Sequence, residues 1–357
     1  MQQPYCIFVS GARNITVRHN DITNVPYSGI RVWGHFNSSS ANTAAFDSGA
    51  AAVFNISGNH VHEIGMSLLS DFGGIFVTTR PAHGSNDCVA GYGDNSCNVL
   101  ALVAGNSVHS VRHHDHGGAG IYTDESSGRT NVTDNLVFNC SGWGLHLHCG
   151  WKHVVVNNLF AGNTAVAPAP FAAYEKSDYA AEPWCNFHSH NTSSQGFSLW
   201  RNIFDQAVAP QVGVGRPVPI FNNAPSTAPS TYGNISNVLV NTTLDMNLYT
   251  CADGDSCGCN FPGNRSLAAW QAWGGKDAHS VGGLPGYLPD LREALAIRRD
   301  FRVDPGRSAA VSHIGFKPLP LQQVGPRPDV QRLVACHNNG GDAGVWWRGC
   351  AVGALRS

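Results

Sequence analysis

A short sequence pattern recurs along this chain and restricts how it can fold. Each copy has a β-prone run, an Asn, two apolar residues, a variable loop, and then Gly-Ile or Gly-Leu opening another β-prone run. The closest copies are roughly two dozen residues apart, which is the length of one supersecondary unit. A unit of that length cannot bury its own apolar face, so neighbouring copies have to stack. The recurring Asn residues are Asn20, Asn59, Asn106, Asn135, Asn158 and Asn202.

The stacked repeats predict an all-β fold, namely a right-handed parallel β-helix (a solenoid) with inserted loops and an irregular C-terminal cap. Stacking should set the Asn side chains above one another, where their amides can form a hydrogen-bonded ladder inside a turn. A β-sandwich would account for the alternating strands. It would not account for the fixed order of the Asn and Gly-Ile phrases.

We expect the parallel β-helix to occupy residues 1–250, with loops inserted near 81–97, 163–196 and 209–231. Beyond residue 250 the repeat fades, and "SLAAWQAWG" and "LPDLREALAIRR" have helical character. Residues 251–357 are therefore predicted to form a C-terminal cap and lateral packing segment of the same domain, because an open end would expose unpaired strand edges.

The composition narrows the possible partners. Only 13% of the residues are charged and 40 are Gly, which suits a turn-rich β protein. The formal net charge is −2, so there is no excess of positive charge to attract nucleic acid or an anionic membrane surface. The sequence contains no run of about 18 apolar residues that would span a bilayer. We therefore expect neither nucleic acid nor a membrane as a partner.

Cysteine usage and glycosylation sequons indicate a secreted glycoprotein. The chain has 11 Cys, which favours a disulfide-bonded extracellular protein. The predicted bridges are Cys88–Cys97, Cys140–Cys149, and Cys251 to either Cys257 or Cys259. The N-x-S/T sequons lie at Asn14, Asn37, Asn55, Asn131, Asn139, Asn191, Asn234, Asn241 and Asn264. Because residues 1–20 contain no signal peptide and already resemble a strand, we expect the sequence to begin inside a longer precursor.

Alternation along the Gly-Ile strands sorts their side chains into columns. The residues predicted to point inward are Ile30, Ile75, Ile121 and Leu145, followed by Val32, Val77, Thr123 and Leu147. Outward columns are predicted for Arg31, Phe76, Tyr122 and His146, and for Trp33, Thr78, Asp124 and His148. Asp71 lies in the turn before its strand, one repeat from Asp124. The two acids should therefore face the same groove, with their carboxyl groups within about 10 Å.

Two carboxylates among aromatic and His side chains favour a site that binds and cleaves sugars. The predicted catalytic residues are Asp71, Asp124 and Glu125. The predicted substrate-binding residues are Trp33, His35, Arg31, Tyr122, His114, His116, Trp143, His146, His148 and His188. Asp124 is assigned as the acid because its aromatic and His neighbours should shield it from water. Asp71 is then the nucleophile or base, although the two roles could be exchanged.

Several of these residues have a structural alternative. Asp71 could cap its turn, as Asp often does before Gly. Glu125 follows Asp124 directly and should point the other way or into the turn. The "HHDH" loop could bind a metal ion, but its spacing is irregular, and "CADGDSCGC" lacks the paired C-x2-C spacing of structural zinc sites. We therefore predict no metal and no cofactor.

The phrases "LLSDFGGIFV", "GAGIYTDESSGRTNVTDNLVFNCSGWGLHLHCG" and "VVVNNLFAGN" carry a family resemblance. The chain resembles the right-handed parallel β-helix proteins of glycoside hydrolase family 141 and its relatives, which include α-L-fucosidases and xylanases acting on plant and algal polysaccharides. The resemblance covers about residues 10 to 320. It implies that Asp71 and Asp124 are the catalytic carboxylates, with Glu125, His146 and His148 nearby.

The sequence therefore predicts a secreted glycoside hydrolase that cleaves a plant- or algal-type polysaccharide with two carboxylates. An alternative is a polysaccharide lyase or uronate epimerase, which needs a base at C5 and cations to neutralise the uronate carboxylate. The available cations would be Arg31, Arg80 and Arg129. A further alternative is a non-catalytic carbohydrate-binding or extracellular-matrix protein that shares the fold, since fold alone does not determine function.

Overall fold

The structure is a computed structural model. It describes residues 4–10, 14–33, 52–79, 99–114, 117–124, 127, 129–147, 153–163, 171–172, 197–205, 218–219, 243–250, 259–261, 265–274, 276–287 and 301–326. The chain separates into two compact units, residues 1–325 and 326–357, and the elements below all belong to the first. The loops expected near 81–97, 163–196 and 209–231 lie largely outside the described residues, and the boundary near residue 250 stays a prediction.

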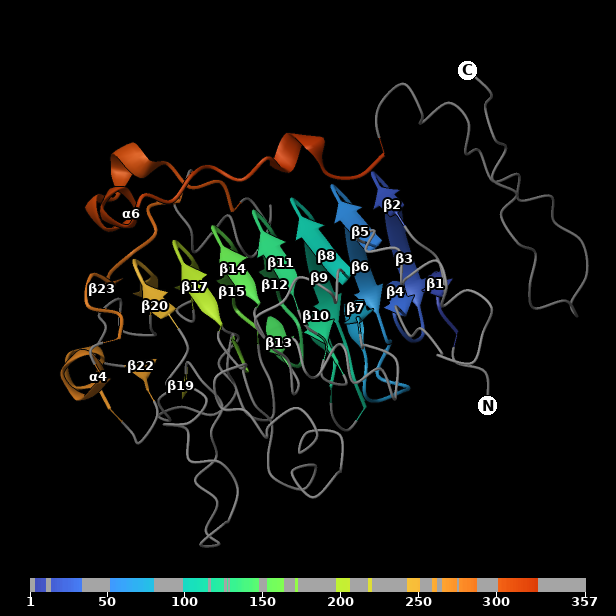
Figure 1. Ribbon diagram of the computed structural model, residues 1–357, viewed down its shortest axis with the longest axis horizontal. Helices are drawn as coiled ribbons and strands as arrows, with labels where there is room; N and C mark the ends of the chain where they lie inside the picture. The colour runs from blue at the N-terminus through green and yellow to red at the C-terminus, as the bar shows by residue number, and fades with distance from the viewer. Residues whose placement is uncertain are drawn as a thin grey trace, which may run out of the picture. The chain divides into compact units, whose positions relative to one another are not determined.

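Three large sheets make up most of the first unit (Figure 1). Sheet A contains β1 (Ile7–Ser10), β4 (Ile30–Trp33), β7 (Gly73–Thr78), β10 (Ala119–Thr123), β13 (Leu145–Leu147) and β16 (Phe171–Ala172). Sheet B contains β2 (Ile15–Arg18), β5 (Ala52–Ser57), β8 (Val99–Ala104), β11 (Thr130–Thr133), β14 (Val154–Val156), β17 (Ser198–Trp200) and β20 (Thr243–Asp245). Sheet C contains β3 (Asp21–Val25), β6 (His60–Ile64), β9 (Ser107–Val111), β12 (Leu136–Phe138), β15 (Leu159–Ala161), β18 (Ile203–Asp205), β21 (Leu248–Thr250) and β23 (Val281–Gly282). A small sheet pairs β19 (Val218–Pro219) with β22 (Cys259–Asn260).

The chain visits the three large sheets in turn, so a strand of these sheets pairs with the strand three places further along, except that β21 pairs with β23. Every pairing between these strands is parallel, and the register is regular: Ile30 pairs with Ile75, which pairs with Ile121. Each repeat therefore adds one strand to every sheet, and equivalent residues form columns that cross the sheets. In Figure 1 the strands follow one another in chain order, from blue β1 to orange β23.

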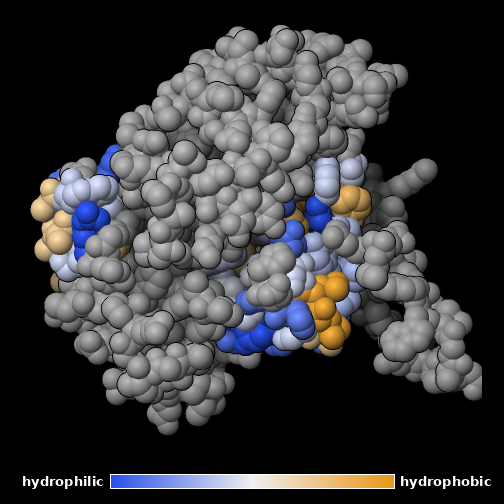
Figure 2. All heavy atoms as spheres, turned by 90° about the horizontal axis from the view of Figure 1, so that it is seen from below, coloured by the Kyte–Doolittle hydropathy of each residue, from blue (hydrophilic) through white to orange (hydrophobic). Residues whose placement is uncertain are grey.

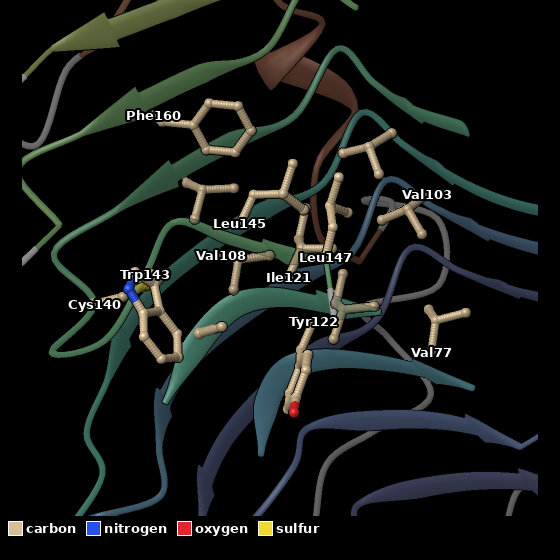
Figure 3. Packing of buried hydrophobic residues seen from close by; sticks show 14 of the residues in the cluster. Val77, Val103, Val108, Ile121, Tyr122, Cys140, Trp143, Leu145, Leu147 and Phe160 are labelled. Carbon is tan, nitrogen blue, oxygen red and sulfur yellow. The ribbon is translucent and has the colours of Figure 1, made fainter. Parts of the chain in front are cut away.

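The core lies between the sheets and is formed by alternate residues of the strands. Ile121, Leu145 and Val108 are fully buried, and Figure 3 shows their side chains packed together. The Gly that precedes Ile in the repeat is required by this packing. A Cβ atom on Gly29 would lie 2.6 Å from the Cγ1 of Val61, and one on Gly74 would lie 2.6 Å from the Cγ1 of Val108. Only Gly lets sheet A approach sheet C this closely.

The predicted Asn ladder is present and lies at the turn between sheets B and C. The Oδ1 of Asn135 accepts hydrogen bonds from the backbone N–H of Asn106 at 2.9 Å and from its Nδ2 at 3.0 Å. The same pair of bonds links each consecutive pair among Asn20, Asn59, Asn106, Asn135, Asn158, Asn202 and Asn247. The alignment predicted for the first four residues is confirmed, and Asn247 extends the ladder beyond the predicted positions.

A left-handed residue precedes every Asn of the ladder and makes the turn. The φ angle is 62° at Gly58 and 61° at Gly105, where Gly adopts it freely. The same conformation occurs at His19, Asp134, Asn157, Arg201 and Met246. For residues such as Arg201 and Met246 this conformation costs about 1–2 kcal/mol. The buried hydrogen bonds of the ladder offset that cost.

Helices accompany the sheets in the C-terminal part of the first unit. They are α4 (Leu267–Gly274), the short 3-10 helices η4 (Pro305–Arg307) and η5 (Leu321–Gln323), and α6 (Ala309–Ile314). The segment with α6 runs back along the repeats toward the N-terminal strands (Figure 1), where Gly325 donates a hydrogen bond to the carbonyl of Gly58. None of the helices within the described ranges is long and apolar enough to cross a membrane.

The fold class predicted from the sequence, an all-β right-handed parallel β-helix with an irregular C-terminal cap, is corrected by this arrangement. The described residues form three stacked parallel sheets with accompanying helices, which gives the fold an α/β-like character. The helical character predicted for "SLAAWQAWG" is confirmed by α4, whereas that of "LPDLREALAIRR" lies outside the described residues. The helix α6 was not predicted, and it buries Val311 and Ile314 in an apolar cluster with sheet C.

The predicted Cys140–Cys149 bridge is wrong. Cys140 is a free thiol that is fully buried, and its Sγ lies 3.6 Å from the carbonyl oxygen of Phe138. Burial raises the pKa of this thiol to about 12, so it stays protonated. Spacing on neighbouring turns does not predict the direction of a side chain, and Cys140 points into the core beside Trp143 (Figure 3). The predicted bridges involving Cys88, Cys97, Cys251 and Cys257 fall outside the described residues.

Candidate active site

A stacked column of flat side chains crosses sheet A, as the sequence predicts. Arg31 pairs in register with Phe76, which pairs with Tyr122, which pairs with His146. The Cζ of Arg31 lies 4.2 Å from the centre of the Phe76 ring. The centre of the Tyr122 ring lies 4.8 Å from that of Phe76 and 4.3 Å from that of His146, and the three rings are nearly parallel.

The column faces away from the inner packing of sheet A. Figure 3 shows the hydroxyl end of Tyr122 directed away from Ile121, Leu145 and Leu147. All four members of the column are nevertheless nearly buried. Burial and continuous stacking hold the rings in one orientation, so the hydroxyl of Tyr122 has a fixed position from which to contact its neighbours.

Asp71 lies at the open end of a tight turn beside this column. Its φ angle is 60°, a left-handed conformation that Asp tolerates better than most residues. Its carbonyl oxygen accepts a hydrogen bond from the hydroxyl of Tyr27 at 2.6 Å, and its Oδ1 accepts one from the hydroxyl of Tyr122 at 3.3 Å. Gly117 packs on the turn so closely that a Cβ atom there would lie 2.8 Å from the Cα of Asp71. The side chain of Asp71 remains exposed.

Asp124 follows β10 directly, two residues after Tyr122. Its backbone N–H donates to the carbonyl of Val77 at 2.9 Å, and its carbonyl oxygen accepts from the hydroxyl and the N–H of Ser127. These bonds fix the backbone at the end of the strand. The residue is only 6% exposed, in contrast to the exposed Asp71.

Tyr27 connects the two acids electrostatically. Burial raises the pKa of Tyr27 well above its usual value, Arg31 lowers it, and the charges of Asp71 and Asp124 raise it further. Coulomb interactions inside a protein fall off with distance, so a group that responds to both acids lies near both. The geometric link between the two acids is Tyr122, whose hydroxyl donates to the Oδ1 of Asp71 and which lies two residues before Asp124. The expected separation of about 10 Å between their carboxyl groups stays a prediction.

The other predicted site residues occupy several environments. Trp33 is half-buried at the end of the column, with the Cζ of Arg31 4.4 Å from its ring centre. His114 is exposed, and its backbone N–H donates to the carbonyl of Leu69 near the Asp71 turn. Trp143 is buried, with its ring centre 4.4 Å from that of His146. The predicted site residues that lie outside the described residues are His35, His116, Glu125, His148 and His188.

Two buried polar atoms at the site have no hydrogen-bond partner among the described residues. They are the hydroxyl oxygen of Thr78, which pairs in register with Trp33, and the Nε1 of Trp143. A buried donor or acceptor left unmatched costs about 1–3 kcal/mol. Such atoms are suited to the hydroxyl groups of a ligand. Figure 2 shows one face of the molecule, where hydrophilic and hydrophobic side chains of the described residues lie side by side.

Sequence reasoning missed two groups of polar residues. Tyr27 donates a hydrogen bond to the carbonyl of Asp71. In the sequence it lies three positions before Ile30, and Phe72 lies three positions before Ile75, the residue that pairs with Ile30. The second group is His60, His62 and His109 on sheet C, whose ligand atoms all lie within 4.8 Å of one another and could hold a metal ion. In the sequence, this group is marked by "NHVH" and "NSVH", which begin at Asn59 and Asn106 of the ladder and both end in His.

Comparisons of the chain with protein-family models, with curated proteins and with solved structures find no match. The resemblance to glycoside hydrolase family 141 therefore stays a prediction. Any function has to be argued from the residues themselves, and the strongest arrangement for that purpose is the pair Asp71 and Asp124 beside the stacked column.

Proposed function

We propose that this protein is a glycoside hydrolase that uses Asp71 and Asp124 as its two carboxylates. One observation carries the proposal: both acids lie near the same tyrosines. Tyr122 contacts the carboxylate of Asp71 and lies two residues before Asp124, and the pKa of Tyr27 responds to the charges of both acids. Hydrolysis of a glycoside uses two carboxyl groups, one protonated and one ionised, on either side of the scissile bond.

The different surroundings of the two acids suggest their roles. Asp124 is nearly enclosed, which suits a general acid that acts on the leaving oxygen in a site that excludes water. Asp71 is exposed and accepts a hydrogen bond from Tyr122, an arrangement that suits a nucleophile or base. Asp71 then attacks the anomeric carbon or activates the water that does so. The separation of the two carboxyl groups decides between these routes.

The proposed substrate is a plant- or algal-type polysaccharide, with fucose- or xylose-containing chains as the first candidates. This choice rests on the resemblance to glycoside hydrolase family 141. Buried polar atoms without partners among the described residues, such as the Nε1 of Trp143, suit a sugar, which offers many hydroxyl groups. The 11 Cys and the sequons support a secreted glycoprotein.

The test is a screen of polysaccharides with the parent chain and with the variants Asp71→Asn and Asp124→Asn. Each variant keeps the shape of the side chain and removes its ability to carry a proton or a charge. We expect kcat to fall by about 10²-fold or more in each, since general acid–base catalysis contributes about 10²–10⁴-fold. The control is Asp245→Asn. Asp245 lies on β20 of sheet B, away from the proposed site on sheet A, and its partly exposed carboxylate pairs with His279. This control should retain full activity.

The products separate the proposal from its alternatives. A hydrolase releases reducing sugars without ultraviolet absorbance, whereas a lyase releases products with a new C4–C5 double bond that absorbs in the ultraviolet. A carbohydrate-binding protein binds a glycan and releases nothing. Near-normal turnover by either Asp variant on a substrate that the parent cleaves would exclude the two-carboxylate mechanism.

A further inference from the structure

A second polar cluster lies on sheet C, on a different sheet from the proposed carboxylates. Asp21 of β3 pairs in register with His60 of β6, and His62 of β6 pairs with His109 of β9. Alternate residues of a strand point to the same side. The residues between them, such as Val61, are fully buried in the core, so these four polar side chains share the opposite, outward side of the sheet.

The nitrogen atoms of the three imidazoles converge. The Nε2 of His60 lies 3.0 Å from the Nε2 of His109, and one ring nitrogen from each of the three His lies within 4.8 Å of the others. The ring centre of His62 lies 4.2 Å from that of His60 and 5.1 Å from that of His109. The rings therefore pack together with one nitrogen of each within 4.8 Å of the others, and the Nε2 of His62 lies 3.1 Å from the Oδ1 of Asp21.

Hydrogen bonds from the other ring nitrogens hold two of the His in this orientation. The Nδ1 of His60 lies 3.0 Å from the Oδ1 of Asp21, and the Nδ1 of His109 lies 3.0 Å from the hydroxyl of Ser110. A His ligand that donates its second ring N–H to a carboxylate or another oxygen is typical of metal sites, because that bond fixes the tautomer and the ring direction. The Nε2 atoms of His60 and His109 are thus both presented toward the same point.

We propose that His60, His62 and His109 bind one divalent transition-metal ion of the zinc class, with Asp21 as the carboxylate partner that orients the imidazoles. Zn–N bonds are about 2.0–2.1 Å, so the nitrogens of a tetrahedral site lie about 3.3 Å apart. The observed spacings reach this geometry by movements on the order of 1 Å. Three protein ligands would leave the fourth position to water or to an anion.

The surroundings of the cluster fit an ion that enters from solvent. The side chains of His60 and His62 are 33% and 20% exposed, whereas His109 is buried and packs on Phe138 with 4.5 Å between ring centres. Further along sheet C most outward positions are apolar, and they pack in one cluster with Val311 and Ile314 of α6. Among the described strands of sheet C, the imidazoles lie on β6 and β9 alone.

The main alternative is a purely structural stack of neutral imidazoles that continues the aromatic contacts of Phe138 and Phe301. In that case each N···N contact is an ordinary hydrogen bond between a donor and an acceptor, and no ion is involved. The two interpretations differ in what happens when Zn²⁺ is supplied, so a binding experiment decides between them.

The experiment uses the full chain, freed of metal by dialysis against a chelator and titrated with Zn²⁺ alone in a calorimeter. The chain has 17 His, so the readout is the difference between the parent and matched variants. We expect one tight equivalent in the parent, at least 100-fold weaker binding at that site in His62→Ala, and 10- to 100-fold weaker binding in Asp21→Asn. The control His279→Ala removes an exposed His whose Nδ1 lies 2.7 Å from Asp245, and it should bind like the parent.

A second measurement guards against a variant that misfolds. Co²⁺ replaces Zn²⁺ in such sites, and a tetrahedral Co²⁺ ion with nitrogen ligands gives visible absorption bands that a surface ion lacks. These bands should appear in the parent, vanish in His62→Ala and in His60→Gln, and persist in His279→Ala, with circular dichroism unchanged throughout. A parent without a tight equivalent, or a His62→Ala variant that binds as tightly as the parent, would overturn the proposal.

Discussion

The Asn ladder and the outward column of sheet A both result from the same register of stacked strands. They differ in whether the residue type stays the same from one repeat to the next. The ladder repeats one residue type at seven consecutive positions, from Asn20 to Asn247. The column presents a different residue at each step, namely Arg31, Phe76, Tyr122 and His146. One repeat therefore supplies both a constant feature and a variable one.

The partners of each group explain the difference. Each interior ladder Asn accepts from the backbone N–H and the side-chain amide of one neighbouring Asn, and donates to a backbone carbonyl and to the amide oxygen of the other. Asn135 accepts from Asn106 in this way and donates to the carbonyl of Val103 and to Asn158. Only a side chain with a donor and an acceptor of that length satisfies all these groups. The column requires only a flat side chain that stacks at 4–5 Å. The residue type can therefore change from one position of the column to the next, whereas the ladder requires Asn at every position.

The largest expected effect is a loss of folding stability at low pH, caused by the buried His153, which is not part of the Asn ladder. His153 is fully buried, accepts a hydrogen bond from the N–H of Thr130, and stacks on Phe197. Burial lowers the pKa of His153 from 6.5 to about 3. Between pH 6.5 and 3 the unfolded chain binds a proton at His153 that the folded chain does not, so stability is lost as the pH falls through this range. The upper bound is about 5 kcal/mol.

The measurement is the free energy of unfolding as a function of pH for the parent and for His153→Gln. Gln keeps an acceptor for Thr130 and cannot be protonated, so the stability of the variant should fall less steeply below pH 6.5. Parallel curves for the two proteins would show that His153 does not titrate in this way.

Substitution within the ladder should have the next largest effect. Asn135→Ala leaves the buried N–H of Asn106 and the buried carbonyl of Val103 without partners, so we expect a loss of about 4 kcal/mol in the free energy of unfolding. The control is Asn20→Ala at the open end of the ladder. Asn20 is half-buried and water reaches its neighbours, so its loss should cost about 1 kcal/mol. Denaturant unfolding of both variants measures the difference, and equal losses would contradict the comparison.

The parts of the structure that the sequence predicts are those that depend on register. The phrases with Asn106 and Asn135 predict the ladder because stacking brings equal positions together. The Gly-Ile phrases predict the Phe76–Tyr122 pair for the same reason. Asn247 was missed because a repeat that follows a long insertion is harder to align, even though "MNLYT" fits the pattern.

The parts that the sequence did not predict depend on side-chain direction and on helix packing. Cys140 points into the core, which its spacing to Cys149 does not determine. The helix α6 covers the outward face of sheet C, and this is why the fold class had to be corrected. The His cluster of sheet C, with His60 and His109, was not predicted. Their convergence becomes visible once β6 and β9 are known to pair.

The smallest effect is expected for one hydroxyl group at the proposed site, and it tests whether the column serves chemistry. Tyr122→Phe keeps the ring stacked between Phe76 and His146 and removes the hydroxyl that donates to the Oδ1 of Asp71 at 3.3 Å. If Asp71 is the nucleophile or base, losing this long hydrogen bond should lower kcat about tenfold, equivalent to about 1.4 kcal/mol. Stability should change by less than about 1 kcal/mol, because the ring packing is kept.

A matched control exists on sheet C, where the hydroxyl of Tyr287 donates to the Oδ2 of Asp205 at 2.6 Å. Tyr287→Phe also removes a hydroxyl from an Asp, but from a buried pair outside the proposed site, so it should lower stability and leave kcat unchanged. Kinetics on a cleaved substrate and thermal melts of both variants give the two readouts. If Tyr122→Phe lowers stability without lowering kcat, the column has a structural role, as the ladder does. Tyr122 would then give no support to the role of Asp71.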